Sequence, residues 1–277
     1  MGKAKDILLR PIPAKDANEL VKRVHYSGKV VQNSQIHIGV FYNGKLEGAM
    51  QFGPSLDKRK IQGLVEGTQW HEFIELNRMA FSDALPRNSE SRAIAIAMKL
   101  LKKHASQVKW VISFADATQC GDGTIYRASG FVLTGIKENG QNYRLPFADQ
   151  LDAAPLLGAG LKEKHVEILR QWLKEITPHA HKMSLEGAPH AHKMSLQGGV
   201  RPSQTLSEVK KIMRIVTGGG TSADQLFKLM GGYPAIGYQL RYIYFIDSTY
   251  RERLTVPELP YSEIDRLGAG MYKGEKR

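Results

Sequence analysis

Residues 109–135 read KWVISFADATQCGDGTIYRASGFVLTG, and this segment decides the fold of the chain. Its first part, 109–116, is apolar on both faces, which is typical of a strand at the buried centre of a sheet. A glycine-rich turn then precedes a short helix, in which Thr124 is a candidate N-cap and Gly130 a candidate C′ glycine. Residues 131–133 return to the sheet. The segment therefore predicts a β-α-β unit built around a buried central strand.

The segments before this unit supply the other elements of one α/β domain. Asn43-Gly44 is a strong signal for a two-residue hairpin turn between two strands. Asp16 is placed to cap a first helix, and a second helix carries apolar residues at helical spacing. The expected elements are, in chain order, a strand at 7–9, a helix at 17–23, strands at 36–42, 46–52 and 72–81, and a helix at 92–104. We therefore expect an α/β (α+β) protein with a mixed central sheet flanked by helices.

The sequence pattern changes after residue 145. Residues 161–176 are amphipathic with a helical period, which predicts a helix. The heptapeptide PHAHKMS then occurs twice, at 178–184 and at 189–195, in a stretch rich in glycine, proline and histidine that is typical of an exposed loop. A strong strand pattern returns at 239–247. We expect three parts: a core at 1–149, a helical insertion at 150–238, and the last core strand with the C-terminal tail at 239–277.

The composition indicates a folded, basic protein. Hydrophobic residues make up 42% of the chain, enough for a core, and the formal net charge is +12, with an excess of positive charge in both halves. Such a charge makes nucleic acid a candidate partner because neutralised phosphates release counterions, although many proteins without this partner are also basic. No run of about 18 apolar residues predicts a membrane span. The N-terminus lacks the apolar stretch of a signal peptide and Cys120 is the single cysteine, so we expect a cytoplasmic protein without an internal disulfide.

The loop LPRNSESR, at 85–92, joins a predicted strand to a predicted helix. Backbone N–H groups at the positive end of a helix suit an anion. Arg87 and Arg92 would add charge-assisted hydrogen bonds, and the polar residues Asn88, Ser89 and Ser91 stand between them. This loop is a candidate anion site, and the alternative is an ordinary helix start capped by serine.

Arg78 and Asp116 are expected near the ends of two neighbouring strands, with Tyr126 of the following helix beside them. Strands inside a sheet rarely carry charged side chains without a partner. If both charges open onto one cleft, they form a candidate active site. The alternative is a structural ion pair of Arg78 with Asp116 or with Glu75.

The tripeptide His25-Tyr26-Ser27 follows the first predicted helix. Histidine accepts protons near neutral pH and tyrosine can orient a substrate or donate a proton, although exposed His-Tyr pairs without function are common. The histidines of the heptapeptide repeat have H-x-H spacing, which is compatible with a metal site, but no carboxylate or cysteine is in register with them. His25 and Tyr26 are therefore the stronger candidates for catalysis.

The pattern G-x-x-Y-x-x-x-G-F at 123–131 resembles the second half of the acyl-CoA-dependent N-acyltransferase fold, the GNAT fold. The resemblance implies that Tyr126 points into an active site and that the turn at 85–92 cradles the pyrophosphate of CoA. The usual GNAT turn has the pattern R/Q-x-x-G-x-G/A. Here Ser89 or Glu90, and Ser91, replace the glycines, which is a departure from that pattern.

A larger set of residues resembles the phage Mom family of DNA-modification proteins, which have a GNAT-like fold. The resemblance covers roughly 7–145 and 239–277, and it is far more specific as an ordered set than in any single piece. The segments that carry it in the core are HYS (25–27), ELNRMAFSD (75–83), PRNSESR (86–92), SFAD (113–116) and GTIYRASGF (123–131).

The resemblance implies an enzyme that converts adenine in DNA to an N6-carbamoylmethyl form, which protects phage DNA from restriction enzymes. It implies catalytic roles for His25, Tyr26, Asp116 and Tyr126, and a role for Arg78 in holding the donor. Acetyl-CoA and iron are the cofactors that it implies. A carbamoylmethyl group is joined through a saturated carbon, so simple acyl transfer does not form it, and we expect an unusual donor or a metal-dependent step.

Adenine N6 is a poor nucleophile and lies inside the duplex stack, so the enzyme must flip the base or meet it unstacked. We expect Asp116 or His25 to accept a proton, and Tyr26 and Tyr126 to position the base. Two other interpretations remain open. One is a conventional acetyl-CoA-dependent N-acetyltransferase of a protein or small amine, and the other is a DNA-binding protein that keeps the fold without catalysis.

Overall fold

The computed structural model describes residues 3–25, 27–117, 121–144, 233–272 and 275–276. The chain divides into two compact units, one made of Met1–Asn139 with Ile236–Arg277 and the other of Gly140–Ala235. The contacts and cavities reported below lie in the first unit. Most of the predicted insertion, including its histidine repeat, lies outside the described residues, as do Tyr26 and Cys120. The division at residues 149 and 238 therefore stays a prediction.

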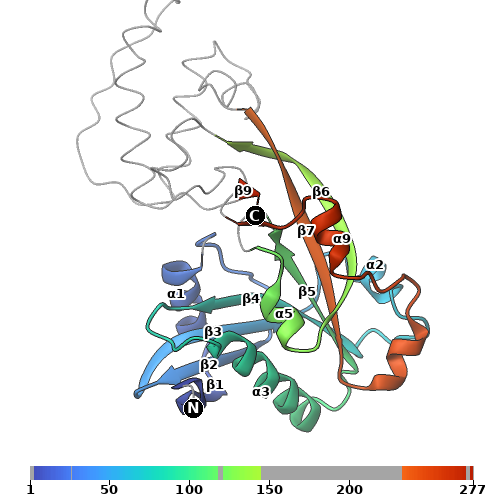
Figure 1. Cartoon of the computed structure of the whole chain (residues 1–277). Coiled ribbons are helices and arrows are strands. Elements are labelled where there is room, and N and C mark those ends of the chain that lie inside the picture. The colour runs from blue at the N-terminus through green and yellow to red at the C-terminus, as the bar shows by residue number, and fades with distance from the viewer. Residues whose placement is uncertain (1–2, 26, 118–120, 145–232, 273–274, 277) are drawn as a thin grey trace, which may run out of the picture. The chain divides into compact units, whose positions relative to one another are not determined.

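A seven-stranded sheet with the order β1-β2-β3-β4-β5-β7-β6 forms the centre of the fold (Figure 1). Neighbouring strands from β1 to β4 are antiparallel, β4 and β5 are parallel, and β5 and β7 are antiparallel. The prediction of a mixed sheet is thus confirmed. The strands are β1 (Leu8–Pro11), β2 (Ile36–Tyr42), β3 (Lys45–Gly53), β4 (Phe73–Phe81), β5 (Trp110–Asp116), β6 (Val132–Arg144) and β7 (Tyr233–Phe245), with β8 (Met271–Tyr272) and β9 (Glu275–Lys276) in a separate pair.

The helices that flank the sheet differ in length. The α-helices are α1 (Ala14–Val24), α2 (Lys58–Gln62), α3 (Ser89–His104), α5 (Thr124–Ala128) and α9 (Ser262–Arg266), and the 3-10 helices are η1 (Lys3–Asp6) and η3 (Ser248–Arg253). In the part of the chain that the structure describes, no helix is long and apolar enough to cross a membrane.

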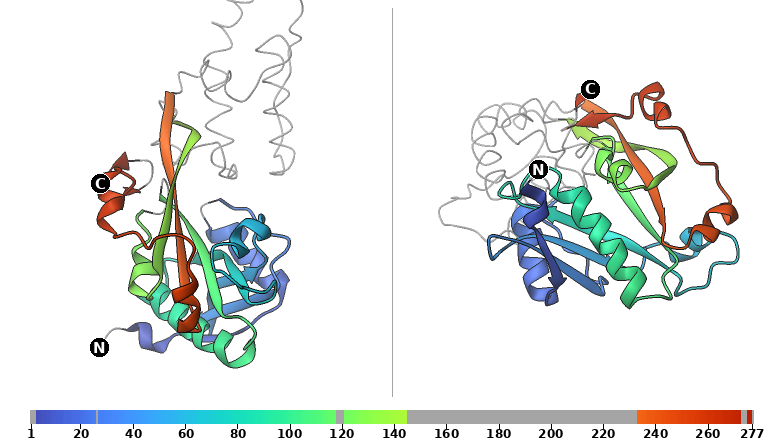
Figure 2. Two further views of the ribbon diagram at one scale, coloured as in Figure 1. Left: turned by 90° about the vertical axis from the view of Figure 1, so that its right-hand side faces the viewer. Right: turned by 60° about the horizontal axis from the view of Figure 1, so that its bottom comes forward.

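One face of the sheet is covered by α3 and α5 (Figures 1 and 2). Ile94 and Met98 of α3 and Tyr126 of α5 join Met50 and Val111 of the sheet in the largest apolar cluster. The apolar residues of α3 recur at helical spacing, so the helix buries one stripe against this face.

The opposite face is covered by α1 and α2 (Figure 2). Leu20 of α1 packs against Ala49 of β3, and the next residue, Met50, belongs to the cluster that includes α3. Ile61 of α2 packs with Ile112, whose neighbour Val111 faces α3. Because successive strand residues point to opposite faces, these two contacts place α1 and α2 on the same side of the sheet.

Several local predictions are confirmed. The strand at 36–42 has the predicted bounds, and Asn43 and Gly44 both have positive φ angles, 49° and 76°, as a type I′ hairpin turn requires. Gly130 follows α5 with a φ of 83°, which fits a C′ glycine. β5 is buried between β4 and β7, as the apolar segment at 109–116 predicted.

Two predicted helix caps are wrong. Pro13 takes the N-cap position of α1, because its fixed φ suits a helix start, and Asp16 lies within the first turn. Gly123 takes the N-cap position of α5 with a φ of 71°, and Thr124 becomes the first helical residue. The Thr124 N–H donates instead to the side chain of Asp122.

Two strands are longer than predicted. β6 continues to Arg144 and β7 begins at Tyr233 rather than at residue 239. The part of β7 that the sequence predicted, from Gln239 onward, is the part that pairs with β5. Residues 233–238, YPAIGY, include a proline and a glycine, which are depleted in strands, and so they gave no strand signal.

Candidate active site

The parallel strands β4 and β5 pair only along their first halves. Hydrogen-bonded register joins Phe73–Glu75 of β4 to Trp110–Ile112 of β5 and extends no further along either strand. β4 carries a bulge just beyond this point, because Gln51 pairs with Arg78 while Phe52 pairs with Leu76. A bulge bends a strand and increases its twist. The second halves of β4 and β5 therefore form two walls rather than a continuous sheet.

A cleft of about 540 Å³ occupies this split. Four of the residues predicted for the active site, His25, Arg78, Asp116 and Tyr126, line it. They come from the end of α1, from β4, from β5 and from α5, so the fold brings together residues about a hundred positions apart. The other lining residues are Val24, Leu76, Asn77, Met79, Ala80, Phe81, Phe114, Ala115, Gly121, Asp122, Gly123, Thr124 and Ile125.

The cleft residues approach the split from both faces of the sheet. Asp116 shares the face of β5 that Ile112 presents toward α2, because the two residues are an even number of positions apart. Ser113 lies on the opposite face, where its hydroxyl is 2.9 Å from the Tyr126 hydroxyl and donates to the Leu76 carbonyl at 3.3 Å. Ser113 thus ties β5 to β4 and to α5 at the point where strand pairing stops.

Tyr126 is buried and fixed by aromatic contacts. Its ring stacks on Tyr242 of β7 with centroids 5.2 Å apart, and Phe131 meets it edge-on at 5.3 Å. The Tyr242 hydroxyl donates to the carbonyl oxygen of Asp122, and burial raises the pKa of Tyr242. Tyr242 therefore supports both Tyr126 and the turn before α5.

The close approach of Tyr242 explains the glycine at position 123. A Cβ atom there would lie 2.6 to 2.8 Å from the Tyr242 ring and hydroxyl, far inside van der Waals contact. The positive φ of Gly123, 71°, is also a conformation that side chains disfavour. The sequence indicates a helix start here and favours a packing role for Tyr242, which its contacts from β7 confirm.

Arg78 holds the loop after α1 against β4. Its Nε donates to the Lys29 carbonyl at 3.0 Å, and its Nη1 donates to the Asn77 carbonyl at 2.7 Å. Asn77, the extra residue of the bulge, accepts a hydrogen bond from Ser34 at 3.2 Å. The guanidinium is thus kept in the wall of the cleft by two backbone oxygens.

His25 ends α1 as its C-cap residue. The backbone N–H of Ser27 donates to Nδ1 at 3.2 Å, and the Ser27 hydroxyl lies 2.9 Å from the same atom. Since Nδ1 accepts the backbone hydrogen bond, the neutral imidazole carries its proton on Nε2. His25 in this form offers an N–H donor, which makes Asp116 the better proton acceptor of the pair.

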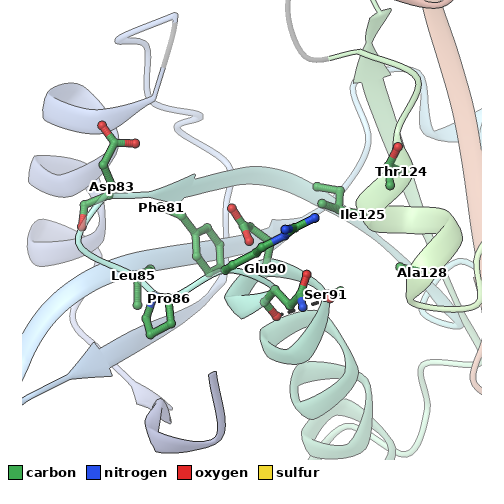
Figure 3. A pocket seen from close by; sticks show the side chains of 12 residues that line it. Phe81, Asp83, Leu85, Pro86, Glu90, Ser91, Thr124, Ile125 and Ala128 are labelled. Carbon is green, nitrogen blue, oxygen red and sulfur yellow. Dashed lines mark hydrogen bonds between the residues drawn. The ribbon is translucent and has the colours of Figure 1, made fainter. Parts of the chain in front are cut away.

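A second cavity of about 480 Å³ lies at the start of α3 and shares Phe81, Thr124 and Ile125 with the cleft. Figure 3 shows Phe81, Glu90 and Ser91 on one side of it, and Thr124, Ile125 and Ala128 of α5 on the other. The two cavities therefore adjoin each other along α5.

The structure separates the residues that were predicted to bind a cofactor. Arg87, Asn88 and Ser91 line the second cavity. Ser89 is buried beneath it, where its hydroxyl donates to the Pro86 carbonyl at 2.6 Å. Arg92 is exposed and is not part of the lining, and Arg78 lines the cleft instead.

The second cavity has two features that suit a phosphate, the start of α3 and Arg87. α3 is 16 residues long, and the positive end of its dipole lies at Ser89. Asn88 adopts a left-handed conformation with a φ of 69°, which turns the loop before the helix. Arg87 adds one positive charge to the lining, while Asp83 and Glu90 add negative charge. The fit to the pyrophosphate of CoA therefore rests on the helix end and on Arg87.

The described residues offer few candidate ligands for a metal ion. In the ranges that the structure describes, no group of three or more His, Cys, Asp and Glu side chains is close enough to hold one ion. The cleft lining contributes three such side chains, His25, Asp116 and Asp122, but Asp122 already accepts hydrogen bonds from Thr124 and Arg127. Iron is thus suggested by the sequence resemblance alone.

Glu75 lies beside the cleft on β4, and burial raises the pKa of its carboxyl, although Asn77 and the charge of Arg78 oppose the shift. A raised pKa means that the folded protein holds this proton more tightly than the unfolded chain. The carboxyl therefore stabilises the folded state below its ordinary pKa of 4.5, and this contribution is lost as the pH rises through the folded pKa.

We expect Glu75→Gln to flatten the dependence of stability on pH above pH 4.5. Urea unfolding at a series of pH values would measure this dependence. The free energy of unfolding should fall less with rising pH in the variant than in the wild type. Glu263→Gln is the matched control, because Arg266 lowers the pKa of Glu263 and the change should have the opposite sign. Identical pH profiles for Glu75→Gln and the wild type would contradict the assignment.

Residues 6–146 match the model of the Mom protein family. A protein of Escherichia phage Mu named methylcarbamoylase mom is 39% identical over 137 residues, which cover 49% of this chain and 56% of that protein. The match thus spans little more than half of the length of that relative.

Solved structures similar to this chain include several GNAT acetyltransferases. One from Streptococcus pneumoniae has a TM-score of 0.35 with 17% identity, covering 48% of this chain and 89% of its own. The ribosomal-protein-S18-alanine N-acetyltransferase of Escherichia coli has a TM-score of 0.34 with 17% identity, covering 47% and 81%. The fold assignment rests on the strand order and on the split between β4 and β5 rather than on these scores.

Proposed function

The chain belongs to the Mom protein family, and we propose that it is an enzyme that transfers a carbamoylmethyl group to N6 of adenine in DNA. The observation that carries this proposal is the cleft between β4 and β5, which gathers His25, Arg78, Asp116 and Tyr126. The similarity to a protein named methylcarbamoylase supports the kind of group transferred. The net charge of +12 supports DNA as the substrate.

The target adenine must leave the duplex to reach this cleft. Extrusion of a base costs unstacking and unpairing, and enzymes recover that cost in a pocket that holds the flipped base. We assign the base to the side of the cleft formed by the end of α1 and by Asp116, with Tyr126 as the aromatic wall beside it. Tyr26 follows His25 in the chain and is proposed as a second tyrosine of this pocket.

The residues of the cleft divide the proton chemistry between them. As N6 forms its new bond to carbon, the bond between that carbon and the donor breaks and the donor leaves with the electron pair, while Asp116 accepts the proton that N6 loses. His25 donates a hydrogen bond from Nε2, because its Nδ1 is held by Ser27. Arg78 stabilises negative charge that develops on the donor, since its guanidinium is fixed by two carbonyl oxygens.

The donor is proposed to occupy the second cavity. Arg87, Ser91 and the N-terminal end of α3 would hold its phosphates, as in an acetyl-CoA-type ligand. CoA would supply a thioester there, which by itself makes an acyl bond rather than a bond through a saturated carbon.

A carbamoylmethyl group on N6 changes the major groove at adenine. Proteins read adenine there through the N7 acceptor and the N6 donor, so a bulky N6 substituent blocks the contact. We propose that this modification protects the DNA from restriction enzymes, and that the protein acts in the host cytoplasm, where that DNA lies.

Nucleoside mass spectrometry tests the proposed function. DNA from cells that express the full chain is digested to nucleosides and compared with DNA from cells carrying the empty vector. We expect an adenosine species heavier by the carbamoylmethyl group and absent from the vector control. An unmodified nucleoside pool would contradict the proposal.

The second candidate is a conventional N-acetyltransferase of a protein or small amine, favoured by the cavity at the start of α3. It predicts unmodified DNA together with acetylated protein or amine in the same cells. DNA binding without either product would leave a DNA-binding protein that has the fold alone.

A further inference from the structure

β3 and β4 are antiparallel neighbours, yet residues 54–72 separate them. Hairpin connections usually have two to five residues, so this connection is a substantial addition at one edge of the site. We name it the β3–β4 arm. Its base is firmly packed: Ile61, Leu64 and Val65 join the apolar cluster under β5, and Val65 forms a bridge with Leu254.

The tip of the β3–β4 arm, in contrast, presents apolar and positive side chains to solvent. Leu56 is 98% exposed, and Trp70 is 51% exposed with the Lys58 ammonium 4.2 Å from its ring centroid. Arg59 and Lys60 follow on α2, both exposed, and Asp57 offsets Lys60 at 3.0 Å. An exposed leucine, an exposed indole and three consecutive cations on one short segment form a surface suited to a polyanion with stacked bases.

The start of the β3–β4 arm is bonded to the loop that borders the cleft. Arg78 donates to the Lys29 carbonyl, and four residues later the Asn33 side chain donates to the Pro54 carbonyl at 3.0 Å. Residues 29–33 thus run from the cleft wall to the start of the β3–β4 arm. The packing of α2 places the arm on the face of the sheet that carries Asp116, against the first halves of β4 and β5, and the cleft begins at Leu76 where these halves end.

From this arrangement we propose that the β3–β4 arm is the element that grips duplex DNA and opens it, an inference that rests on the proposed function. Arg59 and Lys60 contact phosphates, which fixes the position of the duplex. Leu56 enters the base stack as an apolar wedge in the space left by the flipped adenine. Trp70 lies against the opened strand beside it.

Two variants of the full chain test the two halves of this proposal. Arg59→Gln/Lys60→Gln should lower the affinity for duplex DNA and reduce the slope of log K against log salt by about 2, one unit for each lost phosphate contact. The matched control is Lys102→Gln/Lys103→Gln at the exposed end of α3, on the other face of the sheet, which should keep the wild-type slope.

Leu56→Ala should keep the wild-type salt slope but lower the rate of adenine modification in duplex DNA by about ten- to a hundredfold. The same variant should modify adenine in an unpaired bubble at nearly the wild-type rate, since the base there needs no wedge. Leu8→Ala, which removes an exposed leucine from β1, is the control and should change neither rate.

A wild-type salt slope in the double glutamine variant, or wild-type duplex modification by Leu56→Ala, would overturn the proposal. An equal loss on duplex and bubble would also overturn it, because that result assigns Leu56 to the stability of the site. If the wild type makes no modified adenine but its DNA binding depends on Arg59 and Lys60, the proposed function fails while the gripping surface stands.

Discussion

Asp116→Asn should lower the rate of adenine modification by about 10²–10⁴-fold, the range usual for loss of a general base. Asparagine keeps the size and the hydrogen-bonding reach of the side chain but cannot accept a proton from N6. The amount of modified adenosine in DNA at fixed times after induction measures the rate. The melting temperature should stay near that of the wild type, because Asp116 lies at the end of β5 and lines the cleft.

The matched control is Asp265→Asn on α9, an exposed aspartate outside both cavities, and it should leave the rate unchanged. His25→Asn gives the complementary comparison. It keeps a side-chain donor but no titrating group, so it should reduce the rate less than Asp116→Asn if His25 acts as a hydrogen-bond donor. A near-normal rate in Asp116→Asn with a lowered melting temperature would assign Asp116 to structure rather than to proton transfer.

The elements that the sequence predicted well are those whose patterns depend on local contacts. β2 and its turn at Asn43-Gly44 have the expected bounds because alternation and positive φ angles are local properties. The caps of α1 and α5 could not be predicted from one residue. Pro13 occupies the N-cap position of α1 and Gly123 that of α5. The backbone conformation at these residues decides where each helix starts, and the side chains of Asp16 and Thr124 do not determine it.

The candidate site shows the same limit at longer range. Arg78, Asp116 and Tyr126 were predicted to share a cleft because Arg78 and Asp116 were expected near the ends of two neighbouring strands, and all three line it. The bulge at Asn77 and the packing of Tyr242 against Gly123 left no readable pattern, since the Tyr242–Asp122 bond joins residues 120 positions apart. The DNA-binding role that we propose for the tip of the β3–β4 arm had no sequence signal for a different reason, because its residues are exposed and carry no periodicity.

Gly123→Ala should destabilise the first unit by about 2–5 kcal/mol, adding the cost of a left-handed conformation, roughly 1–2 kcal/mol, to that of overpacking, roughly 1–3 kcal/mol. The new Cβ atom would lie 2.6 Å from the Tyr242 ring. The ring cannot easily move away, because its hydroxyl donates to the backbone carbonyl of Asp122. The unfolding midpoint should fall by roughly 5–15 °C, measured by thermal unfolding of the full chain. Activity should fall as well, because the turn and Tyr126 line the cleft.

Gly44→Ala separates the two contributions. Its φ of 76° is nearly that of Gly123, but a Cβ atom there meets nothing within 4 Å, so it should cost only the conformational part. The difference between the two variants is then the contact with Tyr242. Combining Gly123→Ala with Tyr242→Ala should cost less than the sum of the single changes, since the truncated side chain no longer opposes the new methyl group. Equal losses for Gly44→Ala and Gly123→Ala, with additive behaviour in the double variant, would show that Tyr242 does not press on this turn.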